Sequence, residues 1–236
     1  VGACADTWAG WSARLGDNHR MLGVDMRGHG RSAVPEGYPW TIDALVADLA
    51  AVVDHAGLER FHLVGESIGG TIVLAFAARY PERIRTLTVS NGAHRGAPIR
   101  NLSPWPGILA DGGMEAWSNH MMEMRFFERS INPAEWQWYR DQQARGEGDT
   151  VLALADALSA TDLTPELAAV TMPTLLLHPD SSPFIPVALM AELHDALPNS
   201  RLEVFAHTRH GLPFSHAAQC SRVLADFIAD RRRDRA

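Results

Sequence analysis

The chain has 236 residues, of which 46% are hydrophobic and 21% are charged, a balance typical of a globular protein rather than a disordered or fibrous one. One domain is expected at this length, and it needs neither disulfides nor a structural metal. The net charge is −7 and every positive side chain among the 21 is an arginine, so we expect no nucleic-acid partner. No apolar run approaches the roughly 20 residues of a membrane span, and residues 1–8 lack a signal-peptide pattern. We therefore expect a cytoplasmic protein without a membrane partner.

Short aliphatic runs alternate with helical patterns, which is typical of parallel strands joined by crossover helices. The apolar residues between Ile42 and Val53 fall on one helical stripe, with Thr41 as the cap, and further helices are expected at Ile68–Arg79 and from Ala217. We expect strands at Arg20–Val24, Arg60–Val64, Ile84–Ser90, Thr174–His178 and Leu202–Phe205. The predicted fold class is α/β, with a mostly parallel central sheet and helices on both faces.

The stretch from 96 to 161 breaks this alternation. It is rich in Trp and Met, and its helical patterns do not lead into strands. Insertions of this kind in an open parallel sheet usually lie over the carboxyl ends of the strands, where ligands bind. We expect a core formed by residues 1–95 and 162–236, with residues 96–161 inserted as a helical lid.

A Gly-x-Ser-x-Gly motif at residues 65–69 follows one predicted strand and precedes a predicted helix. A serine on such a strained turn projects its hydroxyl above the sheet, and small residues at Gly65 and Gly69 let the backbones pack closely. The sequence therefore predicts a nucleophile at Ser67, with the N–H of Ile68 at the helix start available to an oxyanion.

Two further segments extend this pattern into a family resemblance. Asp25–Ser32 reads DMRGHGRS and Tyr80–Ile84 reads YPERI, and together with the Ser67 motif they resemble the α/β-hydrolase superfamily over nearly the whole chain. Val1–Trp8 is similar to the loop that follows an HG dipeptide in that family, which would place the family's first strands upstream of residue 1. The resemblance implies that Val1 supplies a second oxyanion N–H.

A serine nucleophile needs a base and a group that orients the base. The resemblance places the base at His210, after the last predicted strand, whereas His207 and His216 are close rivals in sequence. The family's usual acid position corresponds to Ser182 here. We expect Asp180, the only carboxylate in that loop, to be the acid, with Ser182 or Asn91 as the alternatives.

The layout of the inserted segment is similar to that of 3-oxoadipate enol-lactonases. By this resemblance Arg95 and Arg125 bind a substrate carboxylate, and we also expect Trp117 to contact the substrate. The alternatives are ion pairs within the lid for the arginines and a place in the lid's own core for Trp117.

These observations predict an enzyme, a serine hydrolase that cleaves a small ester or lactone through an acyl-enzyme, for example a carboxylate-bearing enol-lactone. The alternatives are a carbon–carbon bond hydrolase of a ring-cleavage product and a non-catalytic binding protein. No metal site and no organic cofactor are expected, because the sequence has neither a ligand cluster nor a phosphate-binding glycine loop. The only partner expected is the small-molecule substrate, and a homo-oligomer is compatible with the sequence.

Overall fold

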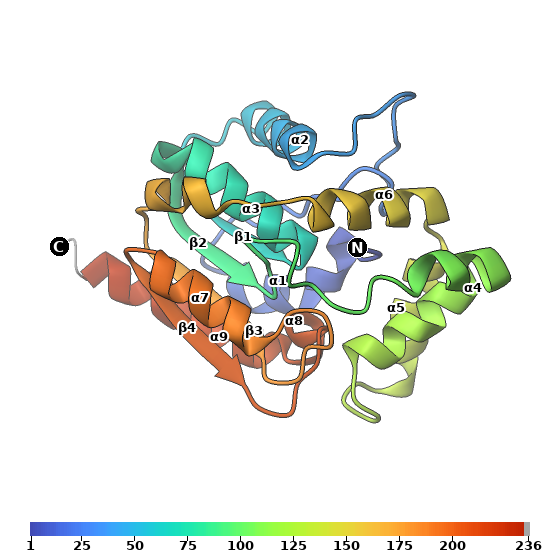
Figure 1. The fold of residues 1–236 in the computed structure, drawn as a ribbon. Helices are drawn as coiled ribbons and strands as arrows, with labels where there is room; N and C mark the ends of the chain where they lie inside the picture. The colour runs from blue at the N-terminus through green and yellow to red at the C-terminus, as the bar shows by residue number, and fades with distance from the viewer. Residues whose placement is uncertain (234–236) are drawn as a thin grey trace.

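A computed structural model of the chain describes residues 1–233 and contains a four-stranded parallel sheet (Figure 1). The strands lie in the order β1 (Phe61–Glu66), β2 (Ile84–Ser90), β3 (Thr174–Pro179) and β4 (Ser200–Phe205), which is also their order in the chain. Four of the five predicted strands and the α/β class are confirmed. In the register of β1 and β2, Glu66 is paired with Ser90, so both strands end at the same edge of the sheet.

The predicted strand at Arg20–Val24 is wrong, because the structure gives this segment no strand pairing. A strand needs a hydrogen-bonded neighbour. Residues 20–24 and β1 instead line one cavity of about 1170 Å³. Consequently, 40–47% of the surface of Met21, Leu22 and Val24 is exposed.

Helices cover both faces of the sheet. Alternate residues of β3 point to opposite faces: Leu176 packs in a core with α2, α3 and α7, whereas Leu175 and Leu177 pack with α1 and α9. The helices outside the inserted segment are α1 (Ala9–Leu15), α2 (Ile42–His55), α3 (Ile68–Arg79), α7 (Val187–Ala196), α8 (Leu212–Ser215) and α9 (Ala217–Arg233), with short 3-10 turns at Ala5–Trp8, Pro81–Arg83 and Thr164–Ala169.

The helix boundaries follow from local chemistry. Thr41 caps α2 by accepting a hydrogen bond from the N–H of Ala44 at 3.2 Å, as predicted. Helix α3 ends at Arg79, two residues before Pro81, whose ring cannot continue a helix. None of the described helices is both long and apolar enough to cross a membrane.

Residues 96–161 hold α4 (Trp105–Arg125, kinked at Gly113), α5 (Pro133–Ala144) and α6 (Gly148–Ser159), which we call the cap helices. Figure 1 shows them grouped on one side of the molecule. The two ends of the segment meet, since the N–H of Gly96 donates to the carbonyl of Thr161 at 2.7 Å. The division into a core and an inserted lid is consistent with this closure and stays a prediction.

Candidate active site

Ser67 occupies a strained turn between β1 and α3. Its φ of 56° and ψ of −125° lie in a region that non-glycine residues rarely adopt, and its N–H donates to the carbonyl of Ser90 at 2.9 Å. Gly65 is required here because a Cβ on it would lie 2.3 Å from the carbonyl oxygen of Gly69. The expectation for Gly69 is wrong, since a Cβ on Gly69 would have no neighbour within 4 Å. Of the two outer glycines of the motif, only Gly65 is required by close backbone packing.

His210 meets Ser67 across the ends of the strands. Its Nε2 lies 2.9 Å from Oγ of Ser67, and its backbone carbonyl accepts a hydrogen bond from Nδ2 of Asn91 at 2.9 Å. The ring of Phe184 packs edge-on against the imidazole at 4.8 Å. The predicted pair of Ser67 and His210 is thus brought together by segments 143 residues apart.

The contacts of the other two histidines of this region lie away from Ser67. Nδ1 of His216 lies 2.9 Å from Oγ of Ser215, and the backbone N–H of His207 donates to Asp180. Neither contact involves Ser67.

The environment of His210 favours its neutral form. The residue is almost fully buried. Burial, followed by the positive charge of Arg125, lowers the pKa of His210 well below the ordinary value of 6.5. The imidazole is therefore uncharged at neutral pH and free to accept a proton from Ser67.

Asp180 does not reach His210, which corrects the prediction that it orients this base. Its carboxylate accepts the backbone N–H groups of His207 at 2.9 Å and Thr208 at 3.2 Å, so it fastens the turn after β4. Two residues further on, Oγ of Ser182 lies 3.2 Å from Nδ1 of His210. The alternative at Ser182 is the one that the geometry supports, while the other alternative, Asn91, bonds the backbone of His210 instead of its ring.

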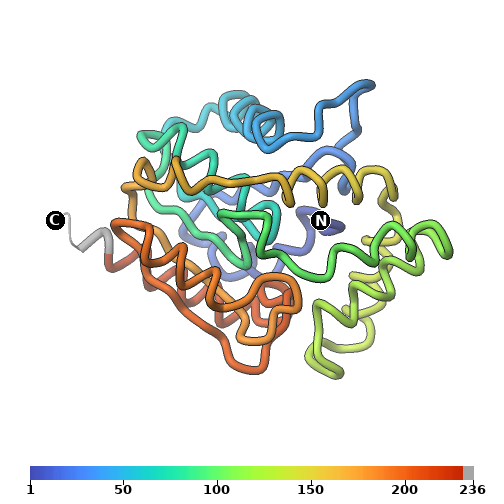
Figure 2. Tube along the Cα trace, viewed as in Figure 1, coloured from blue at the N-terminus to red at the C-terminus, as the bar shows by residue number. Residues whose placement is uncertain are grey.

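The N–H of Ile68 is placed as an oxyanion donor would be. Ile68 is the first residue of α3, so its N–H has no carbonyl partner one turn earlier in the helix. Val1 is buried and lines the same cavity as Ser67 and Ile68. Figure 2 shows the start of the chain between the sheet and the cap helices. The oxyanion roles of Ile68 and Val1 stay predictions.

Arg125 is buried at the wall of the cavity that Ser67 and Ile68 also line, and its guanidinium is held there by other residues of the protein. Its Nε donates to the side-chain oxygen of Gln143 at 2.8 Å, and another guanidinium N–H donates to the carbonyl of Val1. The guanidinium also lies 5.5 Å from the ring centre of Tyr139. Its Nη1 is 3.8 Å from Oε1 of Glu66. A carboxylate of the substrate would have to displace these partners.

The pair of Glu66 and Arg125 was not anticipated from the sequence. Burial raises the pKa of Glu66, and the Arg125 charge opposes that shift. The two residues are 59 positions apart, so no helix or strand periodicity links them in the sequence. A charged residue directly before the motif serine was the one available sign of a buried partner.

Arg95 and Trp117, which were also predicted to contact the substrate, both contact other residues of the protein. Arg95 forms an ion pair with Glu192 on the surface, which favours the alternative of a structural ion pair, although with a partner outside the cap helices. Trp117 is fully buried, packs edge-on against Trp105 at 5.3 Å and lies against Gly2. Its position favours the alternative of a core residue. The described residues contain no group of three or more His, Cys, Asp or Glu side chains arranged to hold a metal.

Comparisons with known proteins identify the family of the chain. A family model described as "Serine aminopeptidase, S33" matches residues 15–216. The chain is 32% identical to a non-heme haloperoxidase of Rhodococcus erythropolis, over 89% of this chain and 82% of that protein. It is 28% identical to 2-hydroxymuconate semialdehyde hydrolase of a Pseudomonas species, over 94% and 82% of the two chains. The solved enol-lactonase of Burkholderia xenovorans superposes with a TM-score of 0.86 and 26% identity, covering 97% and 88%. The chain is therefore an α/β hydrolase and belongs to the serine aminopeptidase S33 family.

Proposed function

We propose that the protein hydrolyses a small ester or lactone through an acyl-enzyme on Ser67, with His210 as general base and acid. The observation that carries this proposal is the 2.9 Å contact between Oγ of Ser67 and Nε2 of a buried His210 whose pKa is lowered. A serine hydroxyl becomes nucleophilic when a neutral base within hydrogen-bond distance accepts its proton.

In the first half-reaction Oγ of Ser67 attacks the carbonyl carbon while its proton moves to Nε2 of His210. The N–H of Ile68, with Val1 as the second predicted donor, stabilises the oxyanion of the tetrahedral intermediate. The intermediate collapses, and the leaving alkoxide takes the proton from His210. In a lactone, that alcohol remains attached to the acyl group.

In the second half-reaction His210 accepts a proton from water, and the hydroxide attacks the acyl-enzyme. Ser67 leaves with a proton and the carboxylic acid is released. Throughout, Nδ1 of His210 must carry its proton so that Nε2 can act as the base. Oγ of Ser182 is placed to accept that Nδ1–H. Ser182 also accepts the N–H of Ile185 at 3.2 Å, which fixes its orientation.

The group that orients His210 is the Ser182 hydroxyl instead of a carboxylate, and this lowers the kcat that we expect. A carboxylate stabilises the imidazolium by charge, and a neutral oxygen does so only by its dipole. Removing the carboxylate of a Ser-His-Asp triad lowers kcat by about 10⁴. We therefore propose a slow hydrolase that acts best on activated esters and strained lactones.

The test is hydrolysis of p-nitrophenyl butyrate and a panel of small lactones by the native protein and Ser67→Ala. We expect the substitution to reduce turnover by several orders of magnitude. Ser103→Ala, which changes an exposed serine in the turn before α4 outside this cavity, is the matched control and should retain full activity. Equal activity in the native protein and Ser67→Ala would contradict the proposal.

A second candidate is hydrolysis of a carbon–carbon bond in a ring-cleavage product. The relative named 2-hydroxymuconate semialdehyde hydrolase, which aligns along most of this chain, favours it. The two reactions are separated by giving the same preparations a vinylogous 1,5-diketone, whose turnover would require a proton to be delivered to carbon.

For the ester or lactone hydrolase, we propose carboxylate-bearing lactones as the substrate class. We propose the cytoplasm as its place in the cell.

A further inference from the structure

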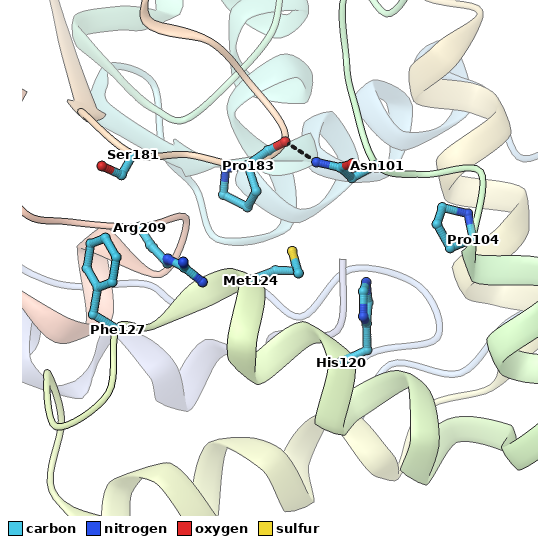
Figure 3. A pocket seen from close by; sticks show the side chains of 8 residues that line it. All are labelled: Asn101, Pro104, His120, Met124, Phe127, Ser181, Pro183 and Arg209. Carbon is cyan, nitrogen blue, oxygen red and sulfur yellow. Dashed lines mark hydrogen bonds between the residues drawn. The ribbon is translucent and has the colours of Figure 1, made fainter.

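A second cavity of about 450 Å³ lies between α4 of the cap helices and the loops that follow β3 and β4 (Figure 3). Neither Ser67 nor His210 lines it. One wall is formed by Ser181 and Pro183, the neighbours of Ser182, and the floor by side chains of α4. The cavity thus adjoins the segment that contacts the Nδ1 side of His210 and is separate from the Ser67 side.

Arg209 provides a positive charge inside this cavity. Figure 3 shows its guanidinium directed into the space between Pro183 and Met124. One N–H donates to the backbone carbonyl of Glu123, and the guanidinium carbon lies 4.5 Å from the centre of the Phe127 ring. Among the described residues, no carboxylate pairs with it. The remaining N–H groups are available to a ligand.

His120 adds a second polar group. Its imidazole rises from α4 into the same cavity (Figure 3), and its Nε2 is buried without a hydrogen-bond partner among the described residues. A buried polar atom without a partner destabilises the protein unless something bonds to it. No acidic side chain lines the cavity. Arg209 therefore offers donors to a ligand, and Nε2 of His120 also donates when it carries the imidazole proton.

The rest of the lining is apolar or neutral. Met124, Phe127, Pro104 and Pro183 form hydrocarbon walls around the space. The Asn101 amide, which could compete for an anion, instead donates to the carbonyl of Pro183 at 2.6 Å. A ligand that satisfies this lining has a planar anionic end and a short hydrocarbon body. A guanidinium binds the two oxygens of a carboxylate side by side.

We propose that this cavity is a binding site for a free small monocarboxylic acid, with Arg209 binding the carboxylate and Nε2 of His120 donating to it. The volume is within the range of small-molecule sites. The site is independent of the reaction proposed at Ser67, because none of its lining atoms belongs to that centre.

The test is isothermal titration of the Ser67→Ala protein with butyrate, with butyramide as the uncharged ligand of the same shape and inorganic phosphate as the anion without a hydrocarbon body. The Ser67→Ala background keeps turnover out of the measurement. We expect saturable millimolar binding of butyrate, and at least tenfold weaker binding of butyramide and of phosphate.

Arg209→Gln should weaken butyrate binding at least tenfold and Arg209→Lys by less, since lysine keeps the charge and loses the planar geometry. Arg129→Gln, which removes an arginine with a 91% exposed side chain, is the matched control and should bind as the parent does. His120→Phe should weaken binding as well. Unchanged butyrate affinity in a folded Arg209→Gln protein, equal affinity for butyramide, or no saturable binding of butyrate would overturn the proposal.

Discussion

Ser182 presents its hydroxyl oxygen to Nδ1 of His210 at 3.2 Å, the position from which a carboxylate orients the base in a Ser-His-Asp triad. Asp180, the acid two residues before Ser182, does not contact the imidazole and instead accepts the backbone N–H groups of two other residues. The base is therefore oriented by a neutral oxygen. This relationship determines how the proposed enzyme should respond to substitution in that loop.

Ser182→Asp should raise kcat for p-nitrophenyl butyrate by about 10- to 1000-fold. The new carboxylate would accept the N–H of Ile185 as Ser182 does, and it would stabilise the imidazolium by charge. Ser182→Asn is the matched control, because it has nearly the same shape and no charge, and it should give no such increase. Steady-state kinetics with all three proteins make the comparison. A Ser182→Asp protein that folds and is slower than the native protein would contradict the role given to Ser182.

Asp180→Asn should leave kcat within about threefold of the native value, since Asp180 contacts the turn after β4 and not the imidazole. We expect only a modest loss of stability, about 1 kcal/mol, because the amide oxygen retains one acceptor. Urea unfolding and steady-state kinetics measure the two effects. A loss of kcat approaching 10⁴ at unchanged stability would restore Asp180 as the orienting acid.

The pH dependence of kcat/KM should have its acidic midpoint below 6.5, because burial and the Arg125 charge lower the pKa of His210 and the neutral imidazole is the active form. Arg125→Gln removes the nearby charge and should move that midpoint upward. Arg129→Gln, on an exposed turn, should not move it. Rate profiles from pH 4 to pH 9 provide the measurement, and a native midpoint above 6.5 would be inconsistent with a buried neutral base.

Stability should fall as the pH drops below about 6.5. Burial lowers the pKa of His178 to about 4, and its Nε2 donates to the carbonyl of Ile185. The unfolded chain takes up a proton near pH 6.5 and the folded protein resists it until about pH 4, so the loss accumulates between those values. Between pH 6.5 and pH 5 it amounts to about 2 kcal/mol. Urea denaturation of the native protein and His178→Gln measures it.

The difference in free energy of unfolding between the native protein and His178→Gln should shrink at low pH. His55→Gln, at the exposed end of α2, is the control and should keep the native pH slope. If His178→Gln kept the full native slope, His178 would not be the group that titrates.

Gly65→Ala should prevent the turn at Ser67 from forming, whereas Gly69→Ala should be tolerated. The two substitutions add the same methyl group, but at Gly65 it meets a rigid backbone carbonyl at 2.3 Å and at Gly69 it meets open space. Thermal unfolding should show a loss of several °C or failure to fold for Gly65→Ala and little change for Gly69→Ala. Comparable stability of both variants would show that the turn relaxes around the methyl group.

Much of this fold follows from local sequence signals. The four confirmed strands are apolar runs between turn residues, and Thr41 and Pro81 mark helix boundaries by their own hydrogen bonding and ring geometry. The segment at Arg20–Val24 has the same local pattern and is not a strand, because strand formation depends on a neighbour that composition does not reveal.

Some residues of the candidate site could likewise be predicted from local sequence signals, and others could not. Ser67 is fixed by a local turn, and His210 by its place after the last strand, so both were predictable. Which side chain of the loop at 180–182 faces His210 depends on how that loop packs against the turn at 207–208. The expectation that the orienting group is a carboxylate wrongly favoured Asp180 over Ser182. The partners of Arg125 are set by packing between distant segments and were not accessible from a pattern.

The most direct test of the central claim is intact-mass analysis of the protein after treatment with a fluorophosphonate, beside Ser67→Ala and His210→Ala. The account predicts one adduct on the native protein, located at Ser67, and none on either variant, because the serine reacts only when His210 accepts its proton. A folded native protein that remains unlabelled, or labelling that persists in His210→Ala at the native rate, would contradict it.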